Sequence, residues 1–430
     1  MAFDPEEMKR RRQQRAEERA RQSAQQRKLL IGLAVAAVVL IACGVLIFTV
    51  SRPAAPTEPP TVLTQPPTAT TGEEFSGEAS TTATSPPTTT IHLAAAGDLN
   101  VTDAVIASGG ILYDYTNAFL DVAHLLANAD IATVNFEGNL YGAPYGSATA
   151  SAPQTMVQAL DRAGVDLVQL ANSYAINQGV SGLAATIDGI RQAGMEPLGV
   201  YANQSDFSRG KGYTIRDVEG IKIAFVAFTK GMNGLSLPSG SENCVNVLYS
   251  DYNSAYQTVN TDGISKILDA AAAEKPDITV ALLHWGSEFN DTVSDSQKKI
   301  VTLMQEKGVD AIIGTHPHYV QKMTLDPETG AFVAYSLGDF FGDAARAGSE
   351  YSVILDLEIT KDNTSGITKI TNFSYTPIFT VHDQHLSSRV LRIHEAIAAY
   401  ESGYINKVSK ETYNAMQYAL QRIEARITGE

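Results

Sequence analysis

The chain has 430 residues, 44% of them hydrophobic and 18% charged, which allows one large or several ordinary domains and excludes both wholesale disorder and a polytopic membrane protein. Its formal net charge is −15. Residues 1–28 hold nine Lys and Arg against five acids, so this end is +4 and the rest of the chain carries −19. So acidic a surface excludes an extended contact with DNA or RNA, because nucleic-acid binding depends on clustered cations.

The N-terminal part predicts a membrane anchor. Residues 29–50 (LLIGLAVAAVVLIACGVLIFTV) are 22 residues without a charge, and a helix of that length spans about 33 Å, the thickness of a bilayer core. The basic residues 1–28 precede this predicted transmembrane helix, so the positive-inside rule places them in the cytoplasm. Residues 51–90 hold eight Pro and twelve Thr, a composition that predicts a disordered linker. We therefore expect a single-pass protein of the cell membrane whose C-terminal domain is extracytoplasmic.

Residues 91–385 have the pattern of an α/β domain. Apolar runs typical of buried strands alternate with stretches at helical spacing. We expect strands at 91–97, 130–136, 166–171, 196–200, 213–218, 221–228, 278–284, 309–314, 332–338 and 351–359, and helices at 117–128, 154–163, 181–193, 254–274 and 294–307. Two pairs of strands follow each other without a helix between them, 213–218 with 221–228 and 332–338 with 351–359. Each pair predicts a hairpin, and hairpins imply a mixed sheet or two stacked sheets.

Residues 386–430 predict a C-terminal helical segment. Two helices are expected, at 388–402 and 409–427. The second has Ser409 as its N-cap and carries one apolar stripe, which predicts that it packs on the domain or on a partner. The stripe consists of Tyr413, Met416, Leu420, Ile423 and Ile427.

Polar side chains stand at the ends of five predicted strands, at the edge where open α/β sheets bind ligands. They are Asp98; Asn135 and Glu137; Asn172, Ser173 and Tyr174; His284, Trp285 and Glu288; and His316 and His318. Alone, each is typical of a turn, a helix cap or a buried histidine. Together, carboxylates and imidazoles form sites for a divalent metal such as Mn, Zn or Fe. The expected ligands are Asp98, Glu137, His284, His316 and His318, and whether one ion, two or none is bound stays open.

In order and spacing these motifs resemble those of the CapA/PgsA capsule-synthesis proteins of poly-γ-glutamate biosynthesis, which are related to calcineurin-like metallophosphoesterases. The resemblance covers about residues 91–380 and rests on Gly97-Asp98, Asn135-Phe136-Glu137 and segments 170–179, 284–288, 314–321 and 335–340. It implies a four-layer α/β/β/α sandwich behind a single membrane helix. It also implies that the protein lies in the envelope of a Gram-positive bacterium and that its partners are polyglutamate synthase or export subunits.

The third motif departs from the family pattern, which is Ala-Asn-Asn-His followed by an Asp. This chain has Ser173 and Tyr174 in place of the Asn and the His, and Asn177 in place of the Asp. In the related phosphoesterases that Asn is a metal ligand and that His protonates the leaving oxygen. A tyrosine, with an ordinary pKa of about 10, is a poor proton donor at neutral pH. Asp339 also replaces a family Asn, and Asn100 stands where a catalytic phosphoesterase has His, so the resemblance implies a degenerate site.

Three functions stay open. The first is a membrane-anchored, extracytoplasmic protein that supports synthesis or export of an anionic surface polymer such as poly-γ-glutamate. The second is an active metal-dependent hydrolase of a phosphoester or of a polymer or cell-wall amide. It would use Glu288 and Tyr174 as catalytic residues and Asn135, Asn172 and Trp285 to bind substrate. The third is a cell-wall module that binds a glycan or peptide and whose histidines are structural.

Overall fold

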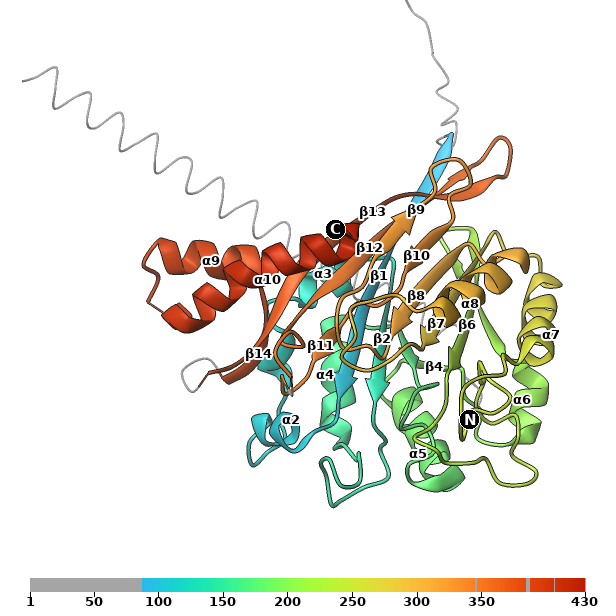
Figure 1. The fold of residues 1–430 in the computed structure, drawn as a ribbon, viewed down its shortest axis with the longest axis horizontal. Coiled ribbons are helices and arrows are strands. Elements are labelled where there is room, and N and C mark those ends of the chain that lie inside the picture. Colours follow the sequence, from blue (N-terminus) through green and yellow to red (C-terminus); the bar gives the residue numbers. More distant parts are fainter. Residues whose placement is uncertain (1–86, 345, 384–386, 406, 430) are drawn as a thin grey trace, which may run out of the picture. The chain divides into compact units, whose positions relative to one another are not determined.

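The computed structural model describes residues 87–344, 346–383, 387–405 and 407–429. The predicted basic tail, the predicted transmembrane helix and nearly all of the predicted linker lie outside the described residues. Within the described ranges, no helix combines the length and the hydropathy needed to cross a bilayer. The described strands form two sheets, and helices pack beside them (Figure 1).

The first sheet has eight strands. Their order is β14 (Ser387–Arg392), β13 (Thr368–Asp383), β12 (Tyr351–Asp362), β1 (Thr88–Asn100), β2 (Ile131–Glu137), β3 (Leu167–Gln169) and β4 (Glu196–Leu198), with β11 (Asp339–Phe341) paired to β1 off this path. Strands β1 to β4 and β11 are parallel, whereas β12, β13 and β14 are antiparallel. The sheet is therefore mixed, as the sequence predicts.

The second sheet has six strands. Their order is β5 (Tyr213–Val218), β6 (Ile221–Thr229), β7 (Ile278–His284), β8 (Ala311–Thr315), β10 (Phe332–Ala334) and β9 (Met323–Leu325). β5 and β6 form the predicted hairpin, which is confirmed. β6, β7, β8 and β10 run parallel, so their carboxyl ends lie at one edge.

Alternating side chains along β6 explain how the sheets and helices are layered. Every second residue from Ile223 belongs to the large core, which also contains the residues of β1 and β2. The residues between them, from Ala224, pack in a smaller core against α7 (Thr261–Ala272) and α8 (Asp295–Glu306). The large core also includes α4 (Gln154–Ala163) and α5 (Gly179–Gln192). The mixed α/β fold is confirmed, and α7 and α8 lie on the face of the second sheet opposite the large core.

Several helices begin where the sequence predicts. α4 has the predicted bounds, and α8 follows Ser294, whose hydroxyl accepts a hydrogen bond from the Gln297 backbone N–H. α10 (Lys410–Thr428) follows the Ser409 cap. Its predicted stripe is confirmed, because Met416, Ile423 and Ile427 are buried in the large core and Tyr413 and Leu420 pack against it. The C-terminal helices therefore pack on the rest of the same chain.

The second predicted hairpin is wrong. β10 ends at Ala334 and pairs with β8 and β9 in the second sheet, whereas β12 pairs with β1 and β13 in the first. The segment 335–350 between them crosses from one sheet to the other and includes β11. Apolar alternation identifies a strand but not its partner, because pairing depends on contacts far apart in sequence.

Three predicted helices are corrected in their extent. Residues 388–392 belong to β14, so only α9 (Ile393–Glu401) is helical there. The helix expected at 117–128 is instead the 3-10 turn η1 (Thr116–Phe119) followed by α3 (Ala123–Asn128). α7 begins only after the Asn260 cap, because the Asp251 carboxylate accepts hydrogen bonds from the backbone at 257 and 258 and folds the preceding loop. Elements absent from the prediction are α2 (Asp103–Ser108), α6 (Gln204–Gly210), β9, β11, β13 and β14.

Candidate metal centre

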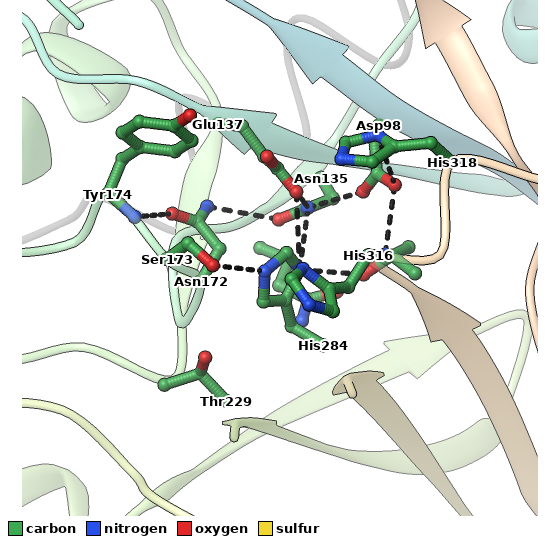
Figure 2. A network of polar contacts seen from close by, with 12 residues as sticks. Asp98, Asn135, Glu137, Asn172, Ser173, Tyr174, Thr229, His284, His316 and His318 are labelled. Atoms are coloured by element: carbon green, nitrogen blue, oxygen red, sulfur yellow. Dashed lines mark hydrogen bonds and ion pairs between the residues drawn. The ribbon is translucent and has the colours of Figure 1, made fainter. Parts of the chain in front are cut away.

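The carboxyl ends of parallel strands bring the predicted residues of both sheets together. In the first sheet, the register pairs Asp98 of β1 with Asn135 of β2. In the second, His284 at the end of β7 lies beside Thr315 at the end of β8. The loop after β8 carries the other two predicted histidines. Figure 2 shows these side chains pointing toward one another from different strands and loops.

One glycine allows β1 to approach the segment before β11. A Cβ at Gly97 would lie 1.8 Å from the carbonyl oxygen of Gly338, so only glycine fits there. The next backbone N–H, of Asp98, donates to that same oxygen at 3.0 Å. This contact places Asp98 in register with Asp339, the first residue of β11.

The first group of candidate ligands consists of Glu137, His284 and His316. One ligand atom from each lies within 4.8 Å of the others. Glu137 Oε1 is 3.3 Å from His284 Nδ1, and the rings of His284 and His316 have centroids 4.4 Å apart. All three are buried, so they form a buried site with one carboxylate and two imidazoles.

The second group consists of Asp98, His318 and Asp339, again with ligand atoms within 4.8 Å of one another. His318 Nδ1 is 2.7 Å from Asp339 Oδ1 and 3.9 Å from Asp98 Oδ2. The backbone N–H of His316 donates to Asp98 Oδ2 at 2.9 Å. That bond connects the two groups directly.

Asn135 lies between the two groups (Figure 2). Its side-chain N–H₂ donates to Asp98 Oδ1 at 2.6 Å and to Glu137 Oε1 at 3.2 Å. Asn172 in turn donates from its side chain to Asn135 Oδ1 at 3.1 Å and to the carbonyl of Phe136 at 2.7 Å. Both asparagines were expected to bind substrate, and in this structure their amides are bonded to the protein and orient the carboxylates.

Burial raises the pKa of the carboxyls at the centre. The pKa of Asp98 rises to about 6, chiefly because the side chain is removed from water. The pKa of Glu137 is raised well above its ordinary value, first by burial and then by the neighbouring Asp98 carboxylate. Without a cation, these acids therefore hold their protons to higher pH than exposed carboxyls do.

The three histidines differ in charge. Burial lowers the pKa of His284 and of His316 well below the ordinary value, so both rings are neutral, the form that ligates metals. Burial alone would also lower the pKa of His318, but the Asp339 carboxylate reverses this effect and raises it well above the ordinary value. A proton is thus held between His318 and Asp339.

The two groups fit a divalent metal. The buried Nδ1 of His316 has no hydrogen-bond partner among the described residues, and such an unpaired ring nitrogen costs free energy that coordination would remove. His316 and His318 have φ of +91° and +58°, conformations that a non-glycine residue adopts at a cost and that occur at ligand sites. Buried imidazole nitrogens and carboxylate oxygens suit Mn, Zn or Fe. The metal role of the five predicted ligands and of Asp339 stays a prediction.

A cavity of about 250 Å³ adjoins this centre. Its lining includes Ser173 and His316 as well as Lys230, Tyr256 and Glu288. Glu288, expected to be catalytic, is exposed there. Ser173 Oγ lies 3.0 Å from His284 Nε2 (Figure 2), so this serine is bonded to a candidate ligand.

The two remaining residues predicted to act on or bind substrate are Tyr174 and Trp285. Tyr174 is half-buried, and burial raises its pKa to about 12, so its hydroxyl holds its proton firmly. Trp285 is fully buried in the smaller core, where its ring stacks on Tyr335 and its Nε1–H donates to the Tyr335 carbonyl at 2.9 Å. The structure therefore gives Trp285 a place in the core and none in the wall of the cavity.

Two residues of the site were missing from the predicted set. Asp339 enters the sequence prediction only as a substitution for a family Asn, although it directly follows the strand expected at 332–338 and so meets the same strand-end rule. Lys230 directly follows β6, so the same strand-end rule that identified the other residues would have identified it. The predicted set covers five strand ends, and the end of the strand expected at 221–228 is not among them.

Comparisons with known proteins agree with the resemblance of the motifs. The family model described as "Bacterial capsule synthesis protein PGA_cap" matches residues 92–344. A capsule biosynthesis protein CapA of Bacillus anthracis is 25% identical over 263 residues, which cover 59% of this chain and 60% of that protein. A PGA biosynthesis protein CapA of Bacillus subtilis (strain 168) is 26% identical over 222 residues, 52% of this chain and 53% of that protein. The chain thus spans between half and two thirds of these relatives.

Two solved structures are similar in part. A phosphatase from Mycoplasma pneumoniae has a TM-score of 0.42 at 13% identity, covering 68% of this chain and 94% of that one. The calcineurin-like phosphoesterase YfkN from Bacillus subtilis has a TM-score of 0.39 at 17% identity, covering 78% and 98%. Likeness at this level carries no conclusion about chemistry.

Proposed function

This chain belongs to the PGA_cap family of bacterial capsule synthesis proteins, and from that membership we propose that it supports the synthesis or export of an anionic surface polymer such as poly-γ-glutamate. In this proposal, residues 29–50 anchor the protein in the cell membrane of a Gram-positive bacterium and the folded part is extracytoplasmic. The uncharged run and the basic residues before it support this orientation. Polyglutamate synthase or export subunits are the proposed partners.

One observation carries the proposal: six buried donor side chains from both sheets converge beside an open cavity. Glu137, His284 and His316 would hold one divalent ion, and Asp98, His318 and Asp339 a second. When bound, such ions supply positive charge and Lewis acidity. A protein with a net charge of −15 otherwise repels a polyanion, so a cationic centre gives the polymer a place to bind.

The chain's own residues prepare this centre. Asn135 holds the Asp98 and Glu137 carboxylates in place through one amide. The Asp339 carboxylate holds a proton at His318 Nδ1, which compensates part of the negative charge when no cation is present. His284 is oriented by Ser173 at one ring nitrogen and by Thr315 near the other. These contacts preorganise the ligands before any cation arrives.

The proposal is tested by deleting the gene and restoring it in three forms: wild type, His316→Ala/His318→Ala, and the control His124→Ala/His394→Ala. The control removes two exposed histidines from helices α3 and α9. Cell-surface polymer and the metal content of the purified full chain are measured. We expect wild type and control to bind metal and restore the polymer, and the first variant to do neither. A deletion that leaves every surface polymer unchanged would reject the role, and a wild-type chain without stoichiometric metal would reject the metal centre.

A metal-dependent hydrolase of a phosphoester, or of a polymer or cell-wall amide, is the second candidate. The observation that favours it is the presence of two adjacent three-residue donor groups, since paired metals serve hydrolytic sites. Two residues argue against a hydrolase. Ser173 is hydrogen-bonded to His284, and Tyr174 has a raised pKa that makes it a poor acid.

Restoring the third motif tests this candidate. In the metal-loaded protein, Ser173→Asn/Tyr174→His should raise phosphodiesterase activity on an activated diester by about a hundredfold, because general-acid catalysis typically contributes about 10²–10⁴-fold. Ser173→Asn alone is the matched control. An unchanged rate in the double variant would show that the altered motif is not what limits hydrolysis. A wild type that hydrolyses neither a diester nor a γ-glutamyl amide would reject the hydrolase.

A further inference from the structure

A second cavity lies at the edge of the first sheet, away from the candidate metal centre. It has a volume of about 230 Å³ and adjoins β14, the outermost strand, which β13 and β12 separate from β1 (Figure 1). Its lining comes from β14, from α9, from the segment between η1 and α3 and from the segment between α9 and α10. The charged residues of the lining are Asp121, Arg389, Arg392, Glu395 and Lys407.

The charge of this lining is opposite to that of the whole chain. Three cations and two acids line the cavity, which gives the lining a net charge of +1, whereas the chain carries −15. None of these residues lines the cavity beside the metal centre. An anion that the rest of the acidic surface repels is therefore attracted here.

The two acids of the lining are the more exposed partners of two ion pairs. Arg389 Nε lies 3.3 Å from Asp121 Oδ2, and Arg392 Nη1 contacts Glu395 Oε1. In the first pair the arginine side chain is 25% exposed and the acid 36%, and in the second pair the values are 29% and 52%. Water screens an exposed charge more than a buried one, so the guanidinium groups dominate the field inside the cavity.

The guanidinium groups of the lining also have hydrogen-bond donors to spare. The described residues accept one side-chain hydrogen bond from this pair of arginines, which Arg392 donates to Glu395. The contact between Arg389 and Asp121 lacks hydrogen-bond alignment, and the Nε of both arginines has no hydrogen-bond partner among the described residues. A guanidinium carries five N–H donors in a rigid fork. An oxyanion in the cavity would supply acceptors that the protein does not.

The uncharged lining indicates which oxyanion fits. Leu391 and Val408 are buried, and Tyr404 is largely exposed, so much of the wall is apolar. A phosphodiester places its two organic substituents on such a wall and carries one negative charge, which balances the net +1. A phosphate is tetrahedral and directs its oxygens to cations of different segments, whereas the two oxygens of a carboxylate lie in one plane. Arginine forks match phosphate oxygens in geometry.

We propose that this cavity is a binding site for a phosphodiester monoanion, held by Arg389 and Arg392 with the exposed Lys407 adding charge. The site goes beyond the proposed function, because it uses none of the donor groups of the metal centre. At about 230 Å³ it is below the usual range of about 300–1,000 Å³ for drug-sized ligands, so it takes the phosphodiester and short parts of its substituents. A lipid headgroup and a soluble phosphodiester share this chemistry.

Calorimetry on the full chain in a phosphate-free, non-ionic detergent tests the site. The probes are dibutyl phosphate, hexanoate as the matched carboxylate, and dihexanoylphosphatidylglycerol beside glycerophosphoglycerol, its headgroup without acyl chains. The variants are Arg389→Met/Arg392→Met and Glu395→Gln. The control Arg191→Met/Arg209→Met removes two exposed arginines from α5 and α6, of which Arg209 also forms an ion pair with an acid. Partition of a probe into detergent is the same for every variant, so the differences between variants report the site.

We expect Arg389→Met/Arg392→Met to weaken binding of dibutyl phosphate at least about tenfold, because two charge-assisted contacts are lost, while the control stays within about threefold of wild type. Glu395→Gln should tighten binding by about threefold or more, because it removes a negative charge from the lining. A variant that merely loses its fold cannot bind more tightly. Chelation of metal should leave all affinities unchanged.

Four results would overturn the proposal. They are an unchanged affinity in Arg389→Met/Arg392→Met, weaker binding in Glu395→Gln, hexanoate binding as tightly as dibutyl phosphate, and loss of binding on chelation, which would place the anion at the metal centre. The remaining probes identify the source of the ligand. Tighter arginine-dependent binding of dihexanoylphosphatidylglycerol than of glycerophosphoglycerol supports a lipid headgroup, and equal arginine-dependent binding supports a soluble phosphodiester.

Discussion

At the scale of single residues, the chemistry of this protein is concentrated in three carboxylates and three imidazoles that water hardly reaches. Asp98, Glu137 and Asp339 are at most 5% exposed. Burial of so many acids in one place is costly unless protons or cations compensate their charge. Burial raises the pKa of Asp98 and Glu137, and the Asp339 carboxylate raises the pKa of His318, so bound protons compensate part of this charge when no cation is present. A divalent cation would replace them.

Metal binding should therefore release protons. Asp98, with a pKa of about 6, and Glu137 and His318, with pKa values raised above the ordinary, carry more protons at pH 5.5 than at pH 7.5. Burial lowers the pKa of His284 and of His316, so these rings compete less with a metal for protons than an ordinary histidine does. Because each displaced proton weakens the apparent affinity below its pKa, we expect the Kd for Mn²⁺ to rise at least about tenfold from pH 7.5 to pH 5.5.

Calorimetry in two buffers of different ionisation enthalpy counts the released protons. Asp98→Asn is the comparison, because it keeps the shape of the side chain and removes one titrating group. It should release fewer protons than wild type at pH 6. An affinity that is independent of pH, or that increases as the pH falls, would contradict this account of the centre.

At the scale of elements, the C-terminal helix supports a loop of the site. Arg426 of α10 has a side chain only 8% exposed, and its Nε lies 3.2 Å from Asp291 Oδ2. Its guanidinium packs on the rings of Tyr319 and Tyr351, at 4.6 and 5.3 Å from their centroids. Asp291 lies two residues after Phe289, whose ring stacks on His318 at 5.0 Å. α10 thus connects to the candidate metal centre through one arginine.

Arg426→Ala should destabilise the protein by about 1–2 kcal/mol, the scale of a buried cation–π contact with its packing. Urea unfolding measures this loss. The matched control is Arg422→Ala on the same helix, since Arg422 is 41% exposed and its contact to Asp291 is long, at 3.4 Å, so its loss should cost less than about 0.5 kcal/mol. Arg426→Ala should also weaken Mn²⁺ binding by loosening the loop before His318. Equal effects of the two variants would contradict a specific role of Arg426.

At the scale of the whole described unit, the site exists because two sheets pack face to face. Asp98, Glu137 and Asp339 come from the first sheet, and His284, His316 and His318 come from β7 and the loop after β8 in the second. Neither sheet supplies a complete donor group alone, because each group contains both an acid of the first sheet and a histidine of the second. Anything that binds both groups therefore holds the two sheets together.

The sequence by itself determined the α/β class and most strands and helix starts, and it singled out the five residues predicted as donors, because hydrophobic period, caps and strand-end position are local properties of the chain. Only the tertiary structure decided that 332–338 and 351–359 lie in different sheets, that 388–392 is a strand, that Trp285 belongs to the core, and that Asp339 and Lys230 join the site. These features depend on which distant segments pack together. The energy of pairing between distant segments does not produce a periodic pattern in the sequence.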